Sequence, residues 1–425
     1  MTDASIAPIQ LPRPVSLRAG DTLARKLMFS LLGRLQGGSL LVWEGEKSHR
    51  FGECNEAASP IEVVVHDAGV YRAILTGGSI AAGETYFRGL WSASDLPAVT
   101  RLFSANMAVL QDFNRRQSAL TTLALNIAHY FRRNSKSGSK DNISAHYDLS
   151  NDFFSLFLDD SMMYSAALFA DKSTTLETAS IAKIDELCRQ LELKQTDHLL
   201  EIGTGWGGLA IHAARHYGCR VTTTTISREQ YRFACERVEA EGLADRITVL
   251  CEDYRALQGS YDKLVSVEMI EAVGHQYYSE YFRTCSELLK QDGKMVIQAI
   301  TMPDQRYDQA RQQVDYIKRY IFPGGCLPSM SVIAKHVATD TDMQIVHVRD
   351  ITEDYAITLS HWRQRFLKEL DRVRHLGFDE TFIRMWDYYL CYCEGGFRER
   401  IIGTVQLAFA KPGYRLPQAD VSEAA

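Results

Sequence analysis

Residues 199–208 read Leu-Leu-Glu-Ile-Gly-Thr-Gly-Trp-Gly-Gly, with glycines alternating at 203, 205 and 207. The stretch joins an apolar run, Asp197–Ile202, to helix-forming residues from Leu209 to His216. A strand, a tight glycine turn and a helix present backbone N–H groups to a bound nucleotide in open α/β sheets. A Cβ atom in the turn would keep the backbone away from the ligand. The stretch therefore predicts a nucleotide-binding loop.

Strand and helix patterns alternate on both sides of this loop. A helix is predicted over Thr175–Leu193. The sheet segments that follow are the strands Asp197–Ile202, Arg220–Thr225, Ile247–Cys251, Leu264–Glu268 and Lys294–Ile300, with helices Gly207–Tyr217, Arg228–Glu241 and Tyr277–Leu289 between them. This alternation predicts a Rossmann-like α/β fold, a parallel sheet with helices on both faces. Ligands of such sheets lie beyond the carboxyl ends of the strands.

The kind of nucleotide is decided by the polar residues near these strand ends. With Gly208 included, the loop also fits the dinucleotide pattern G-x-G-x-x-G, which is a weak signal alone. A dinucleotide site expects an acid about 20 residues further on, at the end of the second strand. Residues 221–227 hold no carboxylate there, although Arg228 could bind a 2′-phosphate. A nicotinamide dinucleotide phosphate therefore stays open.

S-adenosylmethionine is the ligand that we favour. Glu201 stands directly before the first glycine, where the ammonium and ribose of this cofactor need acceptors. Glu252, Asp253 and Tyr254 follow the third strand and could hold the adenine amine.

Length and composition bound the remaining possibilities. The 425 residues suffice for two or three domains. A net charge of −6 argues against a nucleic-acid partner. No run of 18 uncharged apolar residues and no signal-peptide pattern is present, so we expect a cytosolic protein that does not span a membrane. Nine irregularly spaced cysteines predict no disulfide framework, and Cys391 and Cys393 match no common zinc spacing, so no metal is expected.

The first 131 residues are predicted to form a small α+β docking or assembly domain. Asp21 is a candidate N-cap for a helix over Thr22–Leu35, whose apolar and basic residues suit either an anionic membrane surface or packing on its own domain. Short strands are expected at 40–44, 49–53 and 61–65, and a helix at 96–126.

Residues 132–144 are the clearest linker, and residues 145–425 are predicted to form the catalytic domain. Gly and Ser make the linker flexible, and its Lys and Arg would attract lipid phosphates. A soluble hinge is the alternative. Helices at Thr358–Leu376 and Asp379–Cys393 carry many aromatic residues, which either form a core or, as an insertion over the strand ends, wall an acyl tunnel.

Several motifs resemble the cyclopropane-fatty-acyl-phospholipid synthases and the related mycolic acid cyclopropane synthases. The likeness runs from about Ala145 to Phe409, and more weakly through GETYFRGLW at 83–91. Its motifs are AHYDLSNDFF (145–154), MYS (163–165), LLEIGTGWGG (199–208), TISREQ (225–230), EDYR (252–255), EMIEAVG (268–274), YIFPGGCLPS (320–329) and YYLCYCEGGFR (388–398).

The resemblance implies a class I methyltransferase that transfers the methyl group of S-adenosylmethionine to the cis double bond of a phospholipid acyl chain. This needs positioning of the methyl group, aromatic faces near a carbocation, and a base that removes a proton so that the ring closes. By resemblance the cofactor is held by Tyr164, Ser165, Gly203, Gly205, Thr225, Gln230 and Asp253. Glu201 and Gly207 of the loop, and Tyr254 after the third strand, complete the predicted cofactor site.

The resemblance also implies a bound bicarbonate as the base. Glu271 and Tyr320 match two of its side-chain ligands, and Ile300 matches a backbone contact. Ala166 stands where Cys is common, and Gln298 stands where His is common. Gln298 cannot carry a proton, which weakens the anion site.

Glu268 stands where relatives with His usually have Gly, and we expect it to compensate for that loss. The hypothesis is that its carboxylate supplements or replaces bicarbonate, oriented by Gln298. The alternative is that Glu268 binds the linker or a helix N-terminus. Cys393 is expected near the pocket without a chemical role, and His146 and Asp148 are candidate polar contacts.

These observations predict a lipid methyltransferase at the inner membrane surface. Its expected partners are cis-unsaturated phospholipids and the anionic surface itself, and whether it forms a homodimer stays open. A methyl-branched or methylene product, a nicotinamide-dependent reductase and a lapsed lipid-binding protein are the alternatives.

Overall fold

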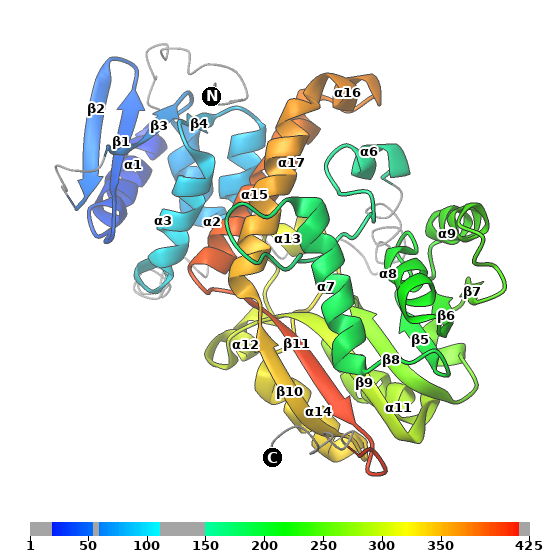
Figure 1. Cartoon of the computed structure of the whole chain (residues 1–425). Helices are drawn as coiled ribbons and strands as arrows, with labels where there is room; N and C mark the ends of the chain where they lie inside the picture. The colour runs from blue at the N-terminus through cyan, green and yellow to red at the C-terminus, as the bar shows by residue number, and fades with distance from the viewer. Residues whose placement is uncertain (1–18, 54–58, 111–148, 416–425) are drawn as a thin grey trace, which may run out of the picture. The chain divides into compact units, whose positions relative to one another are not determined.

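A computed structural model describes residues 19–53, 59–110 and 149–415 (Figure 1). Their contacts divide the chain into two compact units, each built from separate stretches. Unit 1 takes the described residues up to Phe157, then Gln313–Pro323 and Ala356–Ile401. Unit 2 takes Leu158–Gln312, Gly324–Tyr355 and the described residues from Ile402 onward. The expected domain ends at 131 and 145, and the linker between them, lie outside the described residues and stay predictions.

Unit 2 contains a seven-stranded sheet in the order β10-β11-β9-β8-β5-β6-β7. Its strands are β5 (His198–Ile202), β6 (Arg220–Thr224), β7 (Ile247–Leu250), β8 (Tyr261–Val267), β9 (Leu289–Thr301), β10 (Gln344–Asp350) and β11 (Gly403–Ala410). The five strands from β9 to β7 pair in parallel, which confirms the predicted α/β sheet. The sequence pattern did not reveal β10 and β11, which pair antiparallel at the β9 edge.

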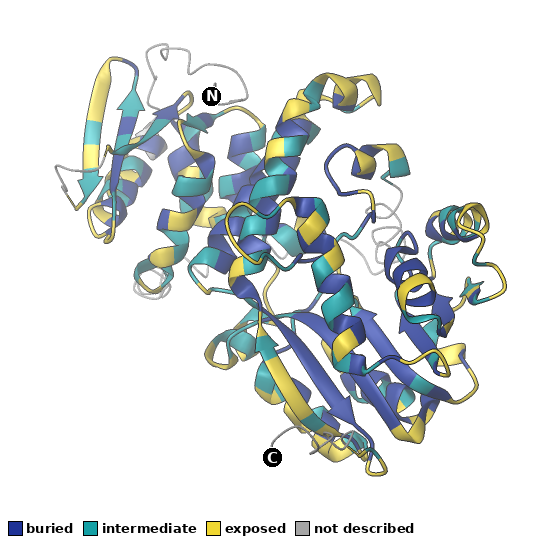
Figure 2. Ribbon diagram, viewed as in Figure 1, coloured by how far each residue is buried: buried dark blue, intermediate teal, exposed yellow. Residues whose placement is uncertain are grey.

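Helices cover both faces of this sheet, as predicted (Figure 2). One buried cluster joins the sheet to α7 (Leu176–Leu191), α8 (Gly208–His212) and α9 (Arg228–Ala240). The cluster on the opposite face includes α11 (Tyr278–Leu288) and α14 (Met330–Asp340). A π-helical turn over Ala213–Tyr217 extends α8, and the short helices of unit 2 are α10 (Ile270–Val273) and α12 (Asp304–Ala310).

Unit 1 contains a four-stranded sheet in the order β2-β1-β3-β4. Its strands are β1 (Ser39–Glu44), β2 (Lys47–Gly52), β3 (Ile61–Val65) and β4 (Trp91–Ala93). Its helices include α1 (Ala19–Leu32), α2 (Gly69–Phe87), α3 (Leu96–Ala105), α6 (Asn151–Ser155), α13 (Tyr316–Tyr320), α16 (Leu370–His375) and α17 (Glu380–Arg398). The three predicted strands are therefore confirmed. The predicted helix from Leu96 ends at Ala105, and residues 111–126 lie outside the described part.

Helix α1 packs on its own unit. Met28, Leu31 and Leu32 are buried, and Arg25 pairs with Glu44 of β1. This packing favours the second interpretation of the helix. The N-cap prediction for Asp21 was wrong, because the helix begins two residues earlier and Asp21 lies in its first turn.

The aromatic residues of α15 (Thr352–Lys368) and α17 form the core of unit 1. Trp362, Phe366 and Trp386 are almost completely buried and surround Phe153 and Phe157. Tight burial among other rings favours the core interpretation over an acyl tunnel. The predicted helix Thr358–Leu376 begins earlier, at Thr352, and is interrupted at Glu369, where α16 follows. None of the described helices is long and apolar enough to cross a bilayer.

Candidate active site

The glycine loop after β5 has the backbone that its sequence predicts. Gly203, Gly205 and Gly207 have φ angles of +102°, +53° and +83°, which side chains rarely adopt. A Cβ built on Gly205 would meet no described atom within 4 Å, so open space lies beside the loop. The loop thus leaves room for a ligand at the carboxyl end of β5, as a nucleotide requires.

Residues 158–169 pack directly against this loop. A Cβ on Gly208 would lie 2.4 Å from the carbonyl oxygen of Ser161, so only glycine permits the approach. The guanidinium of Arg237 in α9 donates to the carbonyl oxygens of Asp160 and Ser161, at 2.9 and 3.1 Å. On the other side, a Cβ on Gly203 would contact Met269. The loop is therefore bordered by the segment that carries Tyr164 and Ser165 and by the turn after β8.

The polar residues at the ends of β5 and β6 are already hydrogen bonded within the unit. The Thr223 hydroxyl contacts both Glu201 and Thr204, at 2.7 Å. Burial raises the pKa of Glu201 to about 8. The Thr225 hydroxyl donates to Gln230 at 2.9 Å, so the structure brings these two predicted cofactor residues together.

The predicted adenine-binding residues follow β7. Arg255 donates to both carboxylate oxygens of Asp253, at 2.6 and 2.9 Å, and these hydrogen bonds hold the Asp253 pKa below its usual value. The ring of Tyr254 packs edge-on against Tyr281 of α11. The Asp253 carboxylate is thus ionised and held in place by its neighbour.

The side chain of Glu268, directly after β8, accepts three hydrogen bonds from described residues. Its Oε1 accepts from the Ala166 backbone N–H at 2.9 Å and from Gln298 Nε2 at 2.8 Å. Its Oε2 accepts from the Tyr355 hydroxyl at 2.8 Å. Burial raises the Glu268 pKa, while these donors and the charge of Lys183 oppose the rise.

The backbone of Glu268 is strained. Its φ angle of +49° lies in the left-handed region, which costs a non-glycine residue roughly 1–2 kcal/mol. Glycine adopts that conformation freely. Retaining a glutamate at this position has an energetic cost, and such costs cluster at functional sites.

Glu271, in α10, lies beside Glu268, and its surroundings favour its neutral form. Its Oε1 accepts from the Ile300 backbone N–H at 2.5 Å. Its Oε2 is buried and has no hydrogen-bond partner among the described residues. Burial, followed by the charge of Glu268, raises the Glu271 pKa to about 8. Burial raises the pKa values of both carboxyl groups, and only Glu268 has three hydrogen-bond donors that favour its anion.

Lys183 supplies a buried positive charge to the same site. It lies on α7, is 0% exposed, and its Nζ donates to Ser165 Oγ at 2.8 Å. Burial lowers its pKa to about 8, and the charges of Glu268, Asp159 and Glu201 act in the opposite direction. The ammonium therefore connects the MYS segment to the carboxylates of the site electrostatically.

The donors expected to bind bicarbonate already bind the two carboxylates. Ala166 and Gln298 donate to Glu268, and Ile300 donates to Glu271. An additional anion would need these same groups and would lie next to a carboxylate. These donors are therefore occupied by the chain's own carboxyl groups, and bicarbonate as the base stays a prediction.

The two other predicted catalytic residues belong to unit 1, and their roles stay predictions. The Tyr320 hydroxyl donates to Glu84 of α2 and accepts from Arg319. Cys393 lies in α17, where burial raises its thiol pKa, so it is not an activated nucleophile. His146 and Asp148 lie outside the described residues.

Three residues of the site were missed by sequence reasoning. Lys183 lies between Ala179 and Leu187 on the buried face of its helix, and a charge on an apolar face was a readable signal. Gln406 interrupts an apolar strand in the same way. Tyr355 carried no signal, because only the fold brings it to Glu268.

The parallel-rich sheet, the glycine loop and the buried carboxylates together define a class I S-adenosylmethionine-dependent methyltransferase. The solved mycolic acid cyclopropane synthase CmaA1, complexed with SAH and CTAB, matches with a TM-score of 0.60 and 29% identity, covering 64% of this chain and 98% of that one. The family model for mycolic acid cyclopropane synthetase matches residues 134–407, and the chain belongs to this family.

Two relatives show how the chain lies within the family. It is 40% identical over 343 residues to the tuberculostearic acid methyltransferase UfaA1 of Mycobacterium tuberculosis, covering 79% of this chain and 80% of the relative. It is 36% identical over 363 residues to the cyclopropane-fatty-acyl-phospholipid synthase of Escherichia coli (strain K12), covering 85% and 91%. Family membership confirms the predicted S-adenosylmethionine-dependent methyltransferase and sets the reductase alternative aside.

Proposed function

We propose that the protein forms cyclopropane rings at the cis double bonds of phospholipid acyl chains, with Glu268 as the proton acceptor. One observation carries the role of Glu268: its carboxylate takes the Ala166 and Gln298 hydrogen bonds that the resemblance assigns to bicarbonate. The E. coli relative, named for this reaction on phospholipids, supports the choice of substrate.

The chain's own groups suit that chemistry. S-adenosylmethionine, when bound, supplies an electrophilic methyl group. The glycine loop, Tyr164, Ser165, Thr225, Gln230 and Asp253 would hold this cofactor. Glu268 Oε2 has one described donor, Tyr355, which leaves a lone pair to accept a proton. Burial raises the Glu268 pKa, which suits a proton acceptor, while the donors Gln298, Ala166 and Tyr355 and the charge of Lys183 favour its anion. Burial also raises the Glu271 pKa to about 8, which favours its neutral form.

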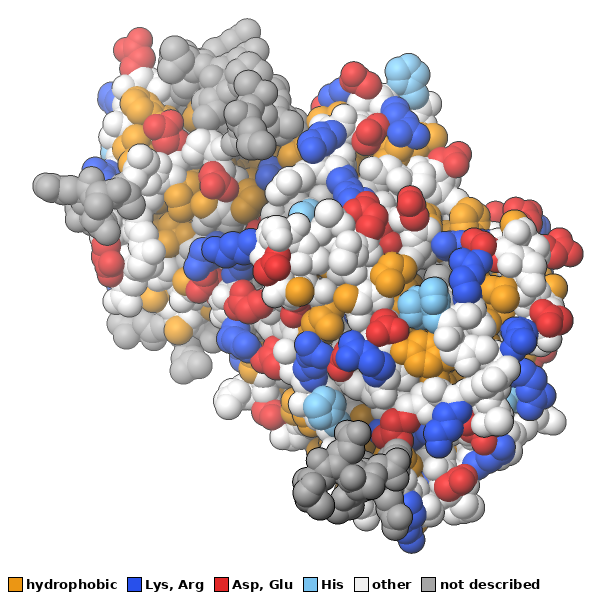
Figure 3. All heavy atoms as spheres, in the orientation of Figure 1, with side chains coloured by type: hydrophobic (Ala, Val, Ile, Leu, Met, Phe, Trp, Pro, Cys, Tyr) orange, Lys and Arg blue, Asp and Glu red, His pale blue; other side chains and the backbone are white. Residues whose placement is uncertain are grey.

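Attachment to an anionic membrane surface from the cytoplasmic side is part of this proposal. On the face shown in Figure 3, Lys and Arg side chains are interspersed with Asp and Glu, without one broad positive patch. The basic residues 132–144 therefore remain our candidate for lipid contact, although they lie outside the described part. A homodimer stays a prediction.

A methyl-branched or methylene product is the second candidate. The observation in its favour is the 40% identity to a relative named tuberculostearic acid methyltransferase. Both outcomes need methyl transfer to an alkene and loss of a proton. They differ in whether the ring closes when the proton leaves.

The experiment incubates the protein with S-adenosylmethionine and vesicles of cis-unsaturated phospholipid, and analyses the acyl chains by mass and proton NMR. A methylene-sized mass gain with high-field ring protons supports the cyclopropane synthase. The same gain with retained olefinic protons supports the second candidate. If the acyl chains gain no mass while the cofactor still binds, both candidate functions are contradicted. The protein would then be an inactive lipid-binding relative of the enzymes.

Two matched variants test the base. Glu268→Gln removes the proton acceptor while keeping its shape, and we expect kcat to fall by at least ~100-fold. Glu271→Gln replaces a carboxyl group that favours its neutral form with a neutral amide, and we expect kcat to fall by at most ~10-fold. Removing dissolved bicarbonate should leave the wild-type rate unchanged. Strong dependence on bicarbonate, with an active Glu268→Gln variant, would show that Glu268 is not the base.

A further inference from the structure

Two glutamines that the reaction does not touch continue outward from the Glu268 site. Gln406 of β11 lies directly opposite Gln298 of β9 in the antiparallel register. Its Nε2 donates to Gln298 Oε1 at 3.0 Å, and its Oε1 accepts from Nε2 of Gln190 in α7 at 2.7 Å. Gln190, Gln406 and Gln298, here called the amide row, thus connect α7 to the carboxylate of Glu268.

The row lies in apolar surroundings. Gln298 and Gln406 are both 0% exposed, on the sheet face where Val296 and Ala408 pack against α7. Burying two primary amides costs free energy unless their groups are paired, and an apolar pair would pack here without that requirement. Their presence in this layer calls for a function beyond packing.

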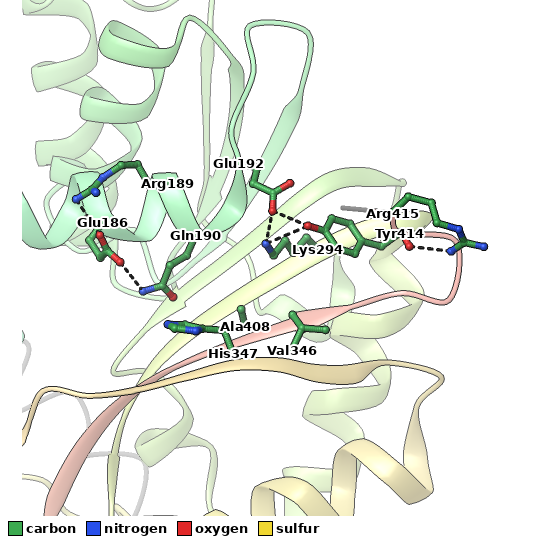
Figure 4. Close-up of a pocket in the computed structure, with 10 residues that line it drawn as sticks. All are labelled: Glu186, Arg189, Gln190, Glu192, Lys294, Val346, His347, Ala408, Tyr414 and Arg415. Carbon is green, nitrogen blue, oxygen red and sulfur yellow. Dashed lines mark hydrogen bonds and ion pairs between the residues drawn. The ribbon is translucent and has the colours of Figure 1, made fainter. Parts of the chain in front are cut away.

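The direction of the row is fixed at both ends by carboxylates. At the outer end, Gln190 Nε2 also donates to Glu186 at 3.2 Å, as the dashed line in Figure 4 shows. At the inner end, Gln298 Nε2 donates to Glu268 and to the Ala166 carbonyl oxygen. An ionised carboxylate only accepts hydrogen bonds, so Gln190 turns its Nε2 toward Glu186 and Gln298 turns its Nε2 toward Glu268. Gln406 lies between them, accepts from Gln190 and donates to Gln298.

We propose that Gln406 and Gln190 are positioning residues, which hold the Gln298 amide in the one orientation that donates to the Glu268 carboxylate. The inference rests on the proposed role of Glu268 as the base. Aligned amides polarise one another, so the row stabilises the anionic form of Glu268 more than one amide would. Without the row, Gln298 could turn its oxygen toward Glu268 and favour the protonated, inactive form.

Other charged and titratable groups face Glu268 and must be held constant in the test. They are Lys183 on α7, Glu271 on α10 and Tyr355 on α15. The variants below leave all three in place.

The test is the pH profile of kcat/KM for Gln406→Leu, with Thr404→Val as the matched control. Thr404 lies two residues away on the same strand, is 0% exposed, and its hydroxyl has no partner among the described residues. For Gln406→Leu we expect the acidic limb of the profile to move to higher pH by ~0.5–1 unit, because the anion of Glu268 loses support. The control should keep the wild-type limb, and both variants should bind S-adenosylmethionine normally.

Gln190→Leu provides a second route that does not depend on folding of a core variant. Gln190 lies at the edge of a cavity of about 610 Å³, where a substitution is tolerated more easily (Figure 4). We expect a limb shift of the same sign and smaller size. The proposal would be overturned if the acidic limb of the pH profile were unchanged in a folded Gln406→Leu variant or in Gln190→Leu. It would also be overturned if Thr404→Val shifted the limb as much as Gln406→Leu.

A readout without turnover separates this inference from the proposed function. Carboxyl ¹³C NMR of protein labelled at glutamate, with Glu268→Gln identifying the signal, reports the Glu268 titration directly. An upward pKa shift in Gln406→Leu supports the amide row even if no lipid product is found. An unshifted titration contradicts the row even if the cyclopropane product is confirmed.

Discussion

A single buried lysine is expected to set the activity near neutral pH. The charge of Lys183 lowers the pKa values of Glu268 and Glu201. Lys183→Met should therefore raise both and move the acidic limb of kcat/KM upward, with a several-fold loss at pH 7. Lys263→Met, which removes another buried lysine from β8, is the control and should keep the limb in place. Equal profiles for the two variants would show that the charge of Lys183 is not felt at Glu268.

The same lysine predicts how stability changes with pH. Its folded-state pKa is lowered from 10.5 to about 8, so between these values the unfolded chain binds more protons. Wild-type stability from this group should therefore rise as pH increases from about 8 to about 10.5, by on the order of 3 kcal/mol at most. Denaturant titrations at pH 7.5 and pH 10 would measure the free energy of unfolding, and this increase should be absent in Lys183→Met. A rise of the same size in the variant would assign it to other groups.

At the residue scale the sequence is informative where a residue type is tied to chemistry. The resemblance led to the hypothesis that the Gln298 amide orients the Glu268 carboxylate, and the structure confirms their contact at 2.8 Å. The other partners of Glu268 and Gln298, which are the Ala166 backbone, Tyr355 and Gln406, depend on contacts that only the folded chain makes. Tyr355 and Gln406 are 87 and 108 residues away from their partners in the chain, and no local pattern records such distances.

At the scale of elements, the glycine loop and the segment that contains Ser161 and the MYS motif pack tightly against each other. Gly208→Ala would place a Cβ 2.4 Å from the Ser161 carbonyl oxygen, so the MYS segment must move. We expect a roughly tenfold or larger increase in the S-adenosylmethionine Kd, measured by calorimetry, since about 1.4 kcal/mol corresponds to tenfold. Gly242→Ala adds a methyl group in open space, where it meets no described atom within 4 Å, and this variant should bind normally. Normal binding by Gly208→Ala would mean that the two segments are independent.

The predictions of strands and helices were correct where the hydrophobic period changes at a glycine-containing turn. The five parallel strands were each found within a few residues, because strands buried in a parallel sheet are rich in apolar or β-branched residues. β10 was missed for the opposite reason: it is an edge strand whose residues are mostly exposed, with Val346 and Val348 facing outward. β11 is buried and apolar, but it lies beyond the alternating pattern that indicates the other strands.

At the scale of the molecule, unit 1 depends on close contact between distant stretches. A Cβ on Gly395 of α17 would lie 2.8 Å from the backbone of Thr100 and Arg101 in α3. Gly395→Val should therefore force these helices apart and destabilise unit 1 by roughly 1–3 kcal/mol. Thermal unfolding and limited proteolysis would detect the change. Gly33→Ala, whose nearest neighbour is an ordinary 3.4 Å contact, should be nearly neutral, and equal stability of the two variants would contradict the close packing.

The position of β11 has a consequence for synthesis in the cell. This strand lies between β9 and β10, so the sheet of unit 2 stays open along that line until residue 410 has been made. Unit 1 likewise waits for α17, which ends at Arg398. Most multidomain chains fold one domain at a time as they leave the ribosome. Here both units would reach their final form almost together, late in translation, so a nascent chain stalled before residue 398 would hold two incomplete cores and depend on chaperones.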